Sequence, residues 1–443
     1  MARRNDPRTI RGWVMYDWAN SAYITSVAGV LFPIYFATQV VPPEGVRILG
    51  RTFDGPSLWA LVVGFGAFVL FLAMPVLGAV ADRSGAKRGL LALFAGVGSA
   101  ATVALPLVGP GRVALALGTF LVTFVAFVAA NVMYNGFLPE ITTDDTIDRV
   151  SARGFAVGYA GGGLQLVLAI AIVAGAERLG IDRTTAERLA IASAGLWWGG
   201  FSAYALGRLR DRPVEPRPSL LEMARAGFAR TWATTRRLRA FPNLLLFVVA
   251  FLLYNDGVQT IIALTSVYAS ETLGLTTPVV LGTFLVVQFV AVGGALLFGR
   301  LAEGLGTKSA ILLAVAGWTA VAVAGALLPA GRPAPFVGLG VAVGIVMGGV
   351  QALSRSLYGS MIPEEASAEF FGFFAVFSKF SAIWGPLIFA AVGTLTGSTR
   401  LAVATLCAFF LLGGLLLALV DVDAARASRR RWRIGPDEVE VAR

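Results

Sequence analysis

The sequence predicts an all-α membrane protein whose twelve transmembrane helices form two pseudo-symmetric six-helix bundles. Three observations indicate this fold class: twelve apolar windows of membrane-spanning length, a biased distribution of positive charge, and a pattern that recurs in the two halves. The composition agrees, because 57% of the 443 residues are hydrophobic and only 14% are charged, whereas soluble domains carry about 25% charged residues. Membrane-spanning strands would be shorter and would alternate polar with apolar residues.

Each apolar window is close to the length that a membrane helix requires, which is roughly 20 residues. Eleven windows carry no charged residue, and the twelfth is interrupted only by Asp256. The window at 380–399 extends back to about residue 370 and then contains Lys379. The twelve windows are 18–43, 57–81, 89–111, 113–139, 154–176, 189–207, 240–270, 272–299, 309–331, 333–354, 380–399 and 401–420.

The distribution of positive charge favours a topology with both termini in the cytoplasm. In that topology 26 of the 36 Lys and Arg residues lie in cytoplasmic segments and 8 in outer loops, while Arg355 and Lys379 fall within spans. Cytoplasmic loops of membrane proteins carry such an excess of Lys and Arg. This topology explains the net charge of +10, and we expect no nucleic-acid partner. The high ratio of arginine to lysine and the short loops suit a bacterium. We therefore expect a monomeric, multi-pass protein of the plasma membrane, with the lipid bilayer as its surroundings.

The longest cytoplasmic segment divides six spans from six. We expect an N-terminal bundle, a linker, a C-terminal bundle and a basic cytoplasmic tail, at residues 1–207, 208–241, 242–420 and 421–443. In the linker, Ser219 and Glu222 have the spacing of a capping box that begins a helix. This segment is either an amphipathic helix on the anionic inner leaflet or a solvated basic linker.

A short motif recurs 221 residues further along the chain. The first copy reads GAVADRSGAKR (78–88) and the second reads GRLAEGLGTKS (299–309). Gly-rich, basic inner loops are common, but two copies in register indicate a duplicated six-span unit. The glycines permit a tight turn, the acidic residue can bind a helix N-terminus, and the basic residues hold the loop at the membrane surface. The residues concerned are Gly78, Asp82, Arg83, Gly85, Lys87 and Arg88 in the first copy, and Gly299, Glu303, Gly306 and Lys308 in the second.

Several segments in both halves resemble known transporters. GAVADRSGAKR is similar to the signature loop of the major facilitator superfamily. Six further segments resemble one branch of that superfamily, the vacuolar-effluxer family, which has fungal autophagy-related members and bacterial members. These segments are YDWANSAY (16–23), NGFLPE (135–140), GYAGGG (158–163), LLYNDGVQT (252–260), QALSRSL (351–357) and EFFGFFAVFSKFSAIWGP (369–386). The resemblance implies the twelve-helix transporter fold, secondary transport of a small molecule and, as in the fungal members, export of neutral amino acids.

Polar side chains inside the spans are the candidates for the transport pathway, because such residues are costly in lipid and normally face a cavity. In the fold that the resemblance implies, spans one, four, seven and ten line the central cavity. The candidates are Tyr16, Asp17, Asn20, Asn131, Asn135, Asp256, Gln351, Ser354, Arg355 and Lys379.

The ionisable candidates allow two interpretations each. The chain contains no histidine, so one aspartate is expected to bind the coupling proton or a sodium ion, and we favour Asp256 because it lies near mid-span. Asp17 either has that role or forms a structural ion pair. Lys379 either pairs with an aspartate or receives a carboxylate of the substrate. Arg355 either binds a carboxylate as a fork or extends to the inner surface.

Two glycine patterns bear on helix packing. Gly154, Gly158 and Gly162 recur four residues apart, a spacing that lets helices approach closely and that also suits an interface between moving halves. The Trp384-Gly385-Pro386 sequence predicts a kink in span eleven, since proline cannot complete the helical hydrogen bonds.

The main alternative function is a membrane enzyme of the prenyltransferase type. Asp144, Asp145 and Asp148 have a DDxxD spacing that can hold Mg²⁺ and a diphosphate, but there is no second aspartate-rich cluster to complete a two-metal site. A solvated acidic loop explains the same residues. No phosphate-binding loop or Cys/His cluster occurs, so we expect no enzymatic activity, no cofactor and no metal site. A channel or a non-transporting sensor is the remaining alternative.

Overall fold

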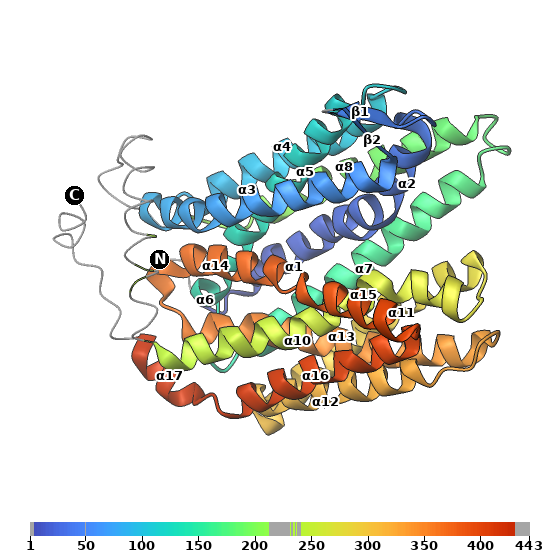
Figure 1. Ribbon diagram of the computed structural model, residues 1–443. Coiled ribbons are helices and arrows are strands. Elements are labelled where there is room, and N and C mark those ends of the chain that lie inside the picture. Colours follow the sequence, from blue (N-terminus) through green and yellow to red (C-terminus); the bar gives the residue numbers. More distant parts are fainter. Residues whose placement is uncertain are drawn as a thin grey trace.

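The computed structural model describes residues 4–48, 50–211 and 241–429, together with residues 231, 234 and 236. Within these residues twelve helical segments are long and apolar enough to span a membrane. They form two groups, one from each half of the chain, which lie side by side (Figure 1). The first helix begins and the last helix ends at the same end of the molecule, which we call the termini side (Figure 1).

The first half contains six spans, the first of which includes turns of π-helix. A two-stranded antiparallel hairpin, paired in the register Val46 to Phe53, follows it. The elements are α1 (Pro7–Ala22), η1 (Tyr23–Leu31), α2 (Phe32–Tyr35), η2 (Phe36–Val40), β1 (Val46–Ile48), β2 (Arg51–Phe53), α3 (Gly55–Ser84), α4 (Lys87–Ala104), η3 (Leu105–Leu107), α5 (Val113–Gly136), α6 (Leu138–Ile141), α7 (Ile147–Ala174) and α8 (Arg183–Leu206).

The second half contains the other six spans and a short helix after the last of them. The elements are α10 (Pro242–Val267), η5 (Tyr268–Thr272), α11 (Thr277–Leu305), α12 (Thr307–Ala326), α13 (Pro333–Met361), η6 (Glu364–Ala366), α14 (Ser367–Phe380), α15 (Trp384–Thr396), α16 (Thr399–Ala418) and α17 (Val422–Arg429). Span eleven is thus divided into α14 and α15, which confirms the kink predicted at residues 384–386.

Each predicted window coincides with one span, so the twelve-helix prediction is confirmed. The first helix begins at Pro7, well before the window at 18–43, because Arg8 and Arg11 lie near its end and Asp17 is buried against a partner. The hairpin and α17 were not predicted. The predicted linker helix from Ser219 lies almost entirely outside the described residues.

The helix ends follow the local sequence. Asp54 and Asp182 accept hydrogen bonds from the backbone amides of Ser57 and Thr185, each at 2.9 Å, and so cap α3 and α8. Gly85 ends α3 with a φ of 61°, a conformation that glycine adopts without steric cost. The tight turn predicted for the signature loop is therefore present, and Gly306, with a φ of 83°, occupies the same position in the repeat.

Two large buried clusters form the apolar core, one in each half. α14 is the exception to this division, because its Ala368 and Val376 belong to the cluster of the first half. The halves pack together where α7 meets α11 and α13, and where α14 meets α3 and α5. These four contacts frame the space between the halves.

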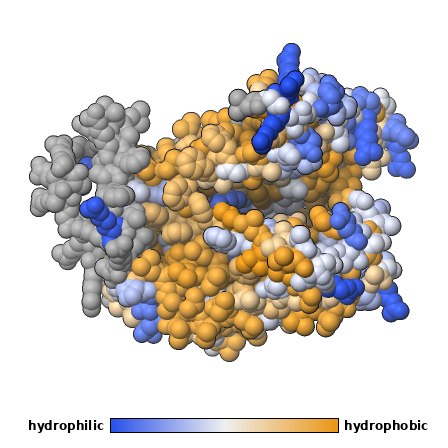
Figure 2. Space-filling model, viewed as in Figure 1, coloured by the Kyte–Doolittle hydropathy of each residue, from blue (hydrophilic) through white to orange (hydrophobic). Residues whose placement is uncertain are grey.

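The outer surface is apolar around the middle of the molecule, and hydrophilic residues gather at the two ends (Figure 2). Many large apolar side chains are exposed there, such as Phe65 (57%), Leu196 (67%) and Leu411 (61%). Lipid is the surroundings in which such a surface is stable, because exposure of this much apolar area to water is unfavourable.

The closest packing in the second half joins α11 to α13 through glycines. A Cβ atom at Gly348 would lie 2.5 Å from the backbone nitrogen of Ala295, and one at Gly294 would lie 2.8 Å from the carbonyl oxygen of Gly344. Small residues allow such backbone contact between membrane helices. Gly338, which also belongs to α13, is exposed, and a Cβ atom there would have no neighbour within 4 Å.

Replacement of Gly348 by alanine is therefore expected to destabilise the protein by about 1–3 kcal/mol, the usual cost of overpacking. Thermal unfolding in detergent measures the effect as a lower midpoint temperature. Gly338→Ala is the matched control and should leave the midpoint unchanged or raise it slightly, because alanine favours helix. Equal midpoints for the two variants would contradict the packing described.

Candidate functional site

A cavity of about 270 Å³ lies between the two halves. α1, α5 and α7 line it from the first half, and α10, α11, α13 and α14 line it from the second. Seven of the ten residues predicted for the pathway line this cavity. They are Asp17, Asn20, Asn131, Asn135, Gln351, Ser354 and Arg355.

An ion pair between Asp17 of α1 and Arg355 of α13 joins the two halves at this cavity. Arg355 Nη1 lies 3.1 Å from Asp17 Oδ2, and the two residues are 4% and 7% exposed respectively. Tyr134 donates its hydroxyl hydrogen to the same carboxylate oxygen at 2.6 Å. Loss of one partner of a buried pair costs about 3–5 kcal/mol, because the other charge is left without compensation.

Further donors of Arg355 are also bound by the first half. Nε donates to Ser151 Oγ and Nη2 donates to the carbonyl oxygen of Ser151, both at 2.9 Å. Nη1 lies 3.4 Å from Asn135 Oδ1. The guanidinium carbon is 4.1 Å from the centre of the Phe155 ring and 4.8 Å from that of Trp13, within range of cation–π attraction. Arg355 is therefore held by the half to which it does not belong.

The glycines of α7 leave the space that the ion pair needs. A Cβ atom at Gly154 would lie 2.6 Å from Asp17 Oδ2 and 2.8 Å from Arg355 Nη2. One at Gly158 would lie 2.8 Å from Ser21 Oγ, and one at Gly162 would lie 2.6 Å from Thr25 Oγ1. The four-residue spacing thus brings α7 close to span one, as predicted.

Neutral polar groups surround the rest of the cavity. Asn20 donates to Asn131 Oδ1 at 3.0 Å, which links α1 to α5 within the first half. Two further bonds cross between the halves. Tyr159 donates to Gln351 Oε1 at 2.8 Å, and Gln288 donates to Thr25 Oγ1 at 3.0 Å.

Three predicted pathway residues lie elsewhere. Tyr16 is buried against Tyr134, with 5.0 Å between the ring centres. Asp256 is buried in α10 and accepts a hydrogen bond from the backbone amide of Gly385 at 2.9 Å. Lys379 lies 5.2 Å from the ring centre of Phe124. Within the described chain Lys379 forms no ion pair, so the structure does not show the aspartate partner that the sequence suggested.

The sequence did not single out several residues of the cavity wall. Ser151 accepts two hydrogen bonds from Arg355. Five further residues line the cavity: Thr25, Tyr159, Gln259, Gln288 and Ser378. Except for Ser151, which precedes the window at 154–176, each of these residues is an uncharged polar side chain in or directly beside an apolar window. Such residues are frequent in membrane helices, and only the packing shows which of them face a cavity.

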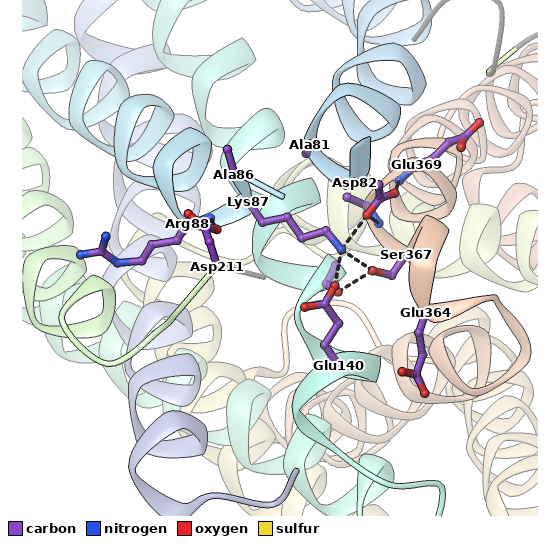
Figure 3. A network of polar contacts seen from close by, with 12 residues as sticks. Ala81, Asp82, Ala86, Lys87, Arg88, Glu140, Asp211, Glu364, Ser367 and Glu369 are labelled. Atoms are coloured by element: carbon purple, nitrogen blue, oxygen red, sulfur yellow. Dashed lines mark hydrogen bonds and ion pairs between the residues drawn. The ribbon is translucent and has the colours of Figure 1, made fainter. Parts of the chain in front are cut away.

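A second polar network joins the halves on the termini side, at the signature loop (Figure 3). Lys87 Nζ lies 2.6 Å from Asp82 Oδ1 and 2.5 Å from Glu140 Oε1, and it donates to Ser367 Oγ at 2.7 Å. Ser367 in turn donates to the carbonyl oxygen of Gly136 at 2.7 Å. We call this set of residues the latch, since Ser367 begins α14 in the second half and the others belong to the first.

Asp82 also binds the N-terminus of α14 directly. Its two carboxylate oxygens accept from the backbone amides of Ala368 and Glu369 at 3.1 and 2.8 Å, where the helix dipole favours a negative charge. Gly78 permits this approach, because a Cβ atom there would lie 2.7 Å from Glu369 Cα. The prediction that Asp82 binds a helix end is confirmed.

The other basic residues of the loop act within the first half or face outward. Arg88 donates from Nε to the carbonyl oxygen of Leu206 at 2.8 Å, and its backbone amide binds Asp211 at 2.5 Å. Arg83 is exposed. Arg88 thus links α4 to the end of α8.

The repeated loop in the second half makes different contacts. Lys308 donates to the carbonyl oxygens of Ala418 and Val420 at 3.2 and 3.0 Å, and so caps α16. Glu303 lies 3.9 Å from Arg149 at an exposed position. The two loops share a sequence pattern, but among the described residues only the first forms a buried network of this kind, in which Lys87 binds Asp82, Glu140 and Ser367.

The acidic loop at residues 144–148 also joins the halves. Asp148 accepts from Thr307 Oγ1 at 2.6 Å and from Ser356 Oγ at 2.5 Å. Asp144 forms a bidentate ion pair with Arg429 of α17, with distances of 2.6 and 3.1 Å. Among the described residues no group of three or more His, Cys, Asp or Glu side chains is arranged to hold a metal ion, and these contacts account for Asp144 and Asp148 as structural residues.

The chain matches the family described as vacuole effluxer Atg22-like over residues 5–430. It belongs to that family. The uncharacterised MFS-type transporter YxiO of Bacillus subtilis is 32% identical to it over 416 residues, which are 93% of this chain and 95% of the relative. The autophagy-related protein 22-1 of Aspergillus niger is 26% identical over 499 residues, covering 91% of this Atg22-like chain and 80% of the relative.

Solved structures of the major facilitator superfamily share the fold of this Atg22-like protein. The human organic anion transporter MFSD10 has a TM-score of 0.66 at 15% identity and covers 94% of this chain and 100% of its own. The transporter FucP in its outward conformation has a TM-score of 0.67 at 12% identity and covers 94% and 99%. The Atg22-like protein is therefore an MFS-type transporter in fold and family, and the resemblance found in the sequence is confirmed.

The latch is expected to hold the termini side closed. Asp82→Ala removes a partner of Lys87 and two acceptors from the start of α14, so it should weaken the closed state by about 1–3 kcal/mol. A cysteine at Ala152, which is buried where α7 meets Gly299 of α11, reports the opening. In a Cys407→Ser background, which removes the one native cysteine, its labelling by a maleimide should become several-fold faster.

Asp54→Ala is the matched control for this experiment, because Asp54 caps the other end of the same helix by accepting a hydrogen bond from Ser57 of its own half. It should leave the labelling rate of the cysteine at position 152 unchanged. Equal rates in the Asp82→Ala and Asp54→Ala variants would show that the latch does not hold the two halves together.

Proposed function

We propose that this protein is a secondary active transporter that moves a small polar solute by alternating access. The Asp17–Arg355 pair carries the proposal, since it faces a cavity and joins one half to the other. Ionisable residues inside a membrane are retained where they serve a pathway. A ligand that separates this pair also removes a bond between the halves, and this couples binding to motion, as population shift requires.

The solute that fits the pair best carries both a carboxylate and an ammonium group, as a neutral amino acid does. Its carboxylate would take the donors that Arg355 now gives to Asp17 and Asn135 as charge-assisted bonds. Its ammonium would bind Asp17. Phe127, Phe155, Phe251 and Phe374 supply the apolar wall, and a cavity of about 270 Å³ suits one solute of this size. The family description, vacuole effluxer, supports export as the direction.

A carboxylate is the natural carrier of a coupling proton here, because the chain has no histidine. We infer that Asp17 has this role, whereas the sequence alone favoured Asp256. Asp17 lines the cavity and binds Arg355, so its protonation would release the guanidinium. Asp256 does not line the cavity and accepts a hydrogen bond from the backbone amide of Gly385. A sodium ion bound by the same Asp17 oxygens is the alternative form of coupling.

The surroundings follow from the charge distribution and the fold. We infer that both termini lie in the cytoplasm, because the excess of Lys and Arg lies on the termini side. We further propose that the protein is a monomer of the plasma membrane. The moving bodies would be residues 1–207 and 242–420, connected by 208–241 and followed by the tail at 421–443. In this orientation the latch is the inner gate.

Flux of labelled neutral amino acids in proteoliposomes tests the proposal. Asp17→Asn should lower flux driven by a proton gradient by more than about tenfold, because Arg355 loses its counter-ion and the carrier of the proton is removed. Asp145→Asn, at an exposed loop position, is the control and should transport as the parent does.

Counterflow in the same vesicles separates a carrier from the alternatives. Uptake of label against preloaded unlabelled solute requires a binding site that alternates between the two sides, and neither a channel nor a sensor shows it. Absence of both counterflow and gradient-driven flux for every neutral amino acid would refute the proposed substrate. Undiminished proton-driven flux in Asp17→Asn would refute the proposed carrier.

A further inference from the structure

Span eleven, Glu364–Thr396, is divided near the middle of its length. α14 ends at Phe380 and α15 begins at Trp384. The last turn of α14 is closed by Ser381, whose backbone amide donates to the carbonyl oxygen of Phe377 at 2.9 Å. Pro386 has no amide hydrogen to continue the helical pattern. The two segments are therefore separate helices joined by residues 381–383.

Adjacent residues of α10 bind the two sides of this break. Asn255 donates from Nδ2 to Ser381 Oγ at 2.5 Å, at the end of α14. Asp256 accepts from the backbone amide of Gly385 at 2.9 Å, in the first turn of α15. All four residues are buried. The Asn255-Asp256 pair thus connects α10 to α14 through one side chain and to α15 through the next.

The close approach of α10 to α15 depends on Gly385. A Cβ atom there would lie 2.7 Å from Asp256 Oδ1 and 3.0 Å from Thr260 Cβ, and would overlap Thr260 Oγ1. Gly385 is also the one buried residue of α15. The contact with Asp256 is therefore the point at which α15 is fixed to the interior of the protein.

The two segments of span eleven have different surroundings. α14 packs against both halves. On the first half, a Cβ atom at Gly372 would lie 2.5 Å from the carbonyl oxygen of Met74, and Phe380 contacts Phe71 with 5.2 Å between ring centres. On the second half, Phe374 stacks on Phe251 with 4.5 Å between ring centres. α15 packs against α10 and α16 of its own half. Trp384, Leu387 and Leu395 of α15 are 65%, 57% and 85% exposed. Span eleven thus leaves the first half at the break.

The face of α3 that meets α14 continues beyond the break with small residues. Phe71, Met74 and Gly78 contact α14, and the helical period places Gly64 on the same face. Ala60 and Ala67 lie on it as well. Gly64 is exposed, and a Cβ atom there would have no neighbour within 4 Å. Small residues of this kind allow a second helix to pack closely.

We propose that α15 is a gate helix that swings about residues 381–383 onto the Ala60–Ala67 face of α3 when the cavity closes opposite the termini side, and that Asn255 and Asp256 are the positioning residues of this hinge. The proposal rests on the alternating access proposed above. It assigns Asp256 a task that needs a hydrogen-bond acceptor at fixed geometry. An asparagine can supply that acceptor, whereas an alanine cannot.

Spin-label distances within the second half test the hinge without any substrate. In the Cys407→Ser background, labels at Leu395→Cys of α15 and Leu281→Cys of α11 report the position of the gate helix. Both side chains are exposed, at 85% and 43%. Asp256→Ala should broaden this distance distribution or shift it, and Asp256→Asn should leave it as in the parent. Gly385→Ala, which displaces the carboxylate, should reproduce the effect of Asp256→Ala.

A second label pair shows whether a change is confined to α15. Leu281→Cys and Leu327→Cys place labels on α11 and at the end of α12, where Leu327 is 74% exposed. This distribution should stay the same in all variants. An unchanged Leu395–Leu281 distribution in both Asp256→Ala and Gly385→Ala would overturn the hinge, and a change in both pairs would show general loosening of the half instead.

Transport measurements keep this result separate from the proposed function. Gly64→Leu has room in the present state but would obstruct the arrival of α15, so it should reduce flux by more than about tenfold with little change in thermal stability. Gly118→Leu on α5, also with no neighbour within 4 Å, is the control. If parent flux is normal and Gly64→Leu transports like Gly118→Leu, α3 does not receive the gate helix. If the parent shows no flux, the distance data still decide the hinge.

Discussion

The attachment of Arg355 to the opposite half organises the centre of this protein. A guanidinium inside a membrane needs a counter-charge and acceptors for its hydrogens, and here Asp17 and Ser151 supply them from the first half. The polar side chains that line the rest of the cavity beside Arg355 and Asp17 are neutral amides and hydroxyls. A site built this way binds a solute strongly only if the solute replaces the bonds that it breaks, so the same residue can select the cargo and keep the halves together.

The duplicated sequence produces a structure in which the two copies do different work. The first signature loop forms a buried network around Lys87 that reaches α14. In the second, the equivalent Lys308 caps α16. The contact between the halves on that side of the molecule depends instead on Asp148, which accepts hydrogen bonds from Thr307 and Ser356. The first loop therefore joins the halves through buried charged side chains, whereas the second loop joins them through the hydroxyl group of Thr307, which donates to Asp148.

Span eleven belongs to both halves in different parts of its length. α14 contributes side chains to the cores of both halves, while α15 packs against α10 and α16 of the second half. In the hinge that we propose, a helix divided in this way links closure on one side of the membrane to opening on the other. The break is stable because Asn255 and Asp256 satisfy polar groups that lipid could not satisfy, so a single motif in α10 fixes both helix ends.

Length and polarity of the apolar windows determined the twelve spans by themselves, because backbone polar groups in a bilayer must be satisfied internally and windows of this length suit helices rather than the shorter strands of a barrel. The repeat and the motifs are local patterns too, and they indicated the family. Seven of the ten residues predicted for the pathway, Asp17 and Arg355 among them, line the cavity. The pairing of these charges was decided only by the tertiary structure. Asp256 and Asp17 both lie among apolar residues in the sequence. Asp256 differs because it binds the backbone amide of Gly385, which is 129 residues further along the chain, and so contacts a helix end rather than the cavity. Contacts between halves depend on how two bundles pack, and no local pattern contains that information.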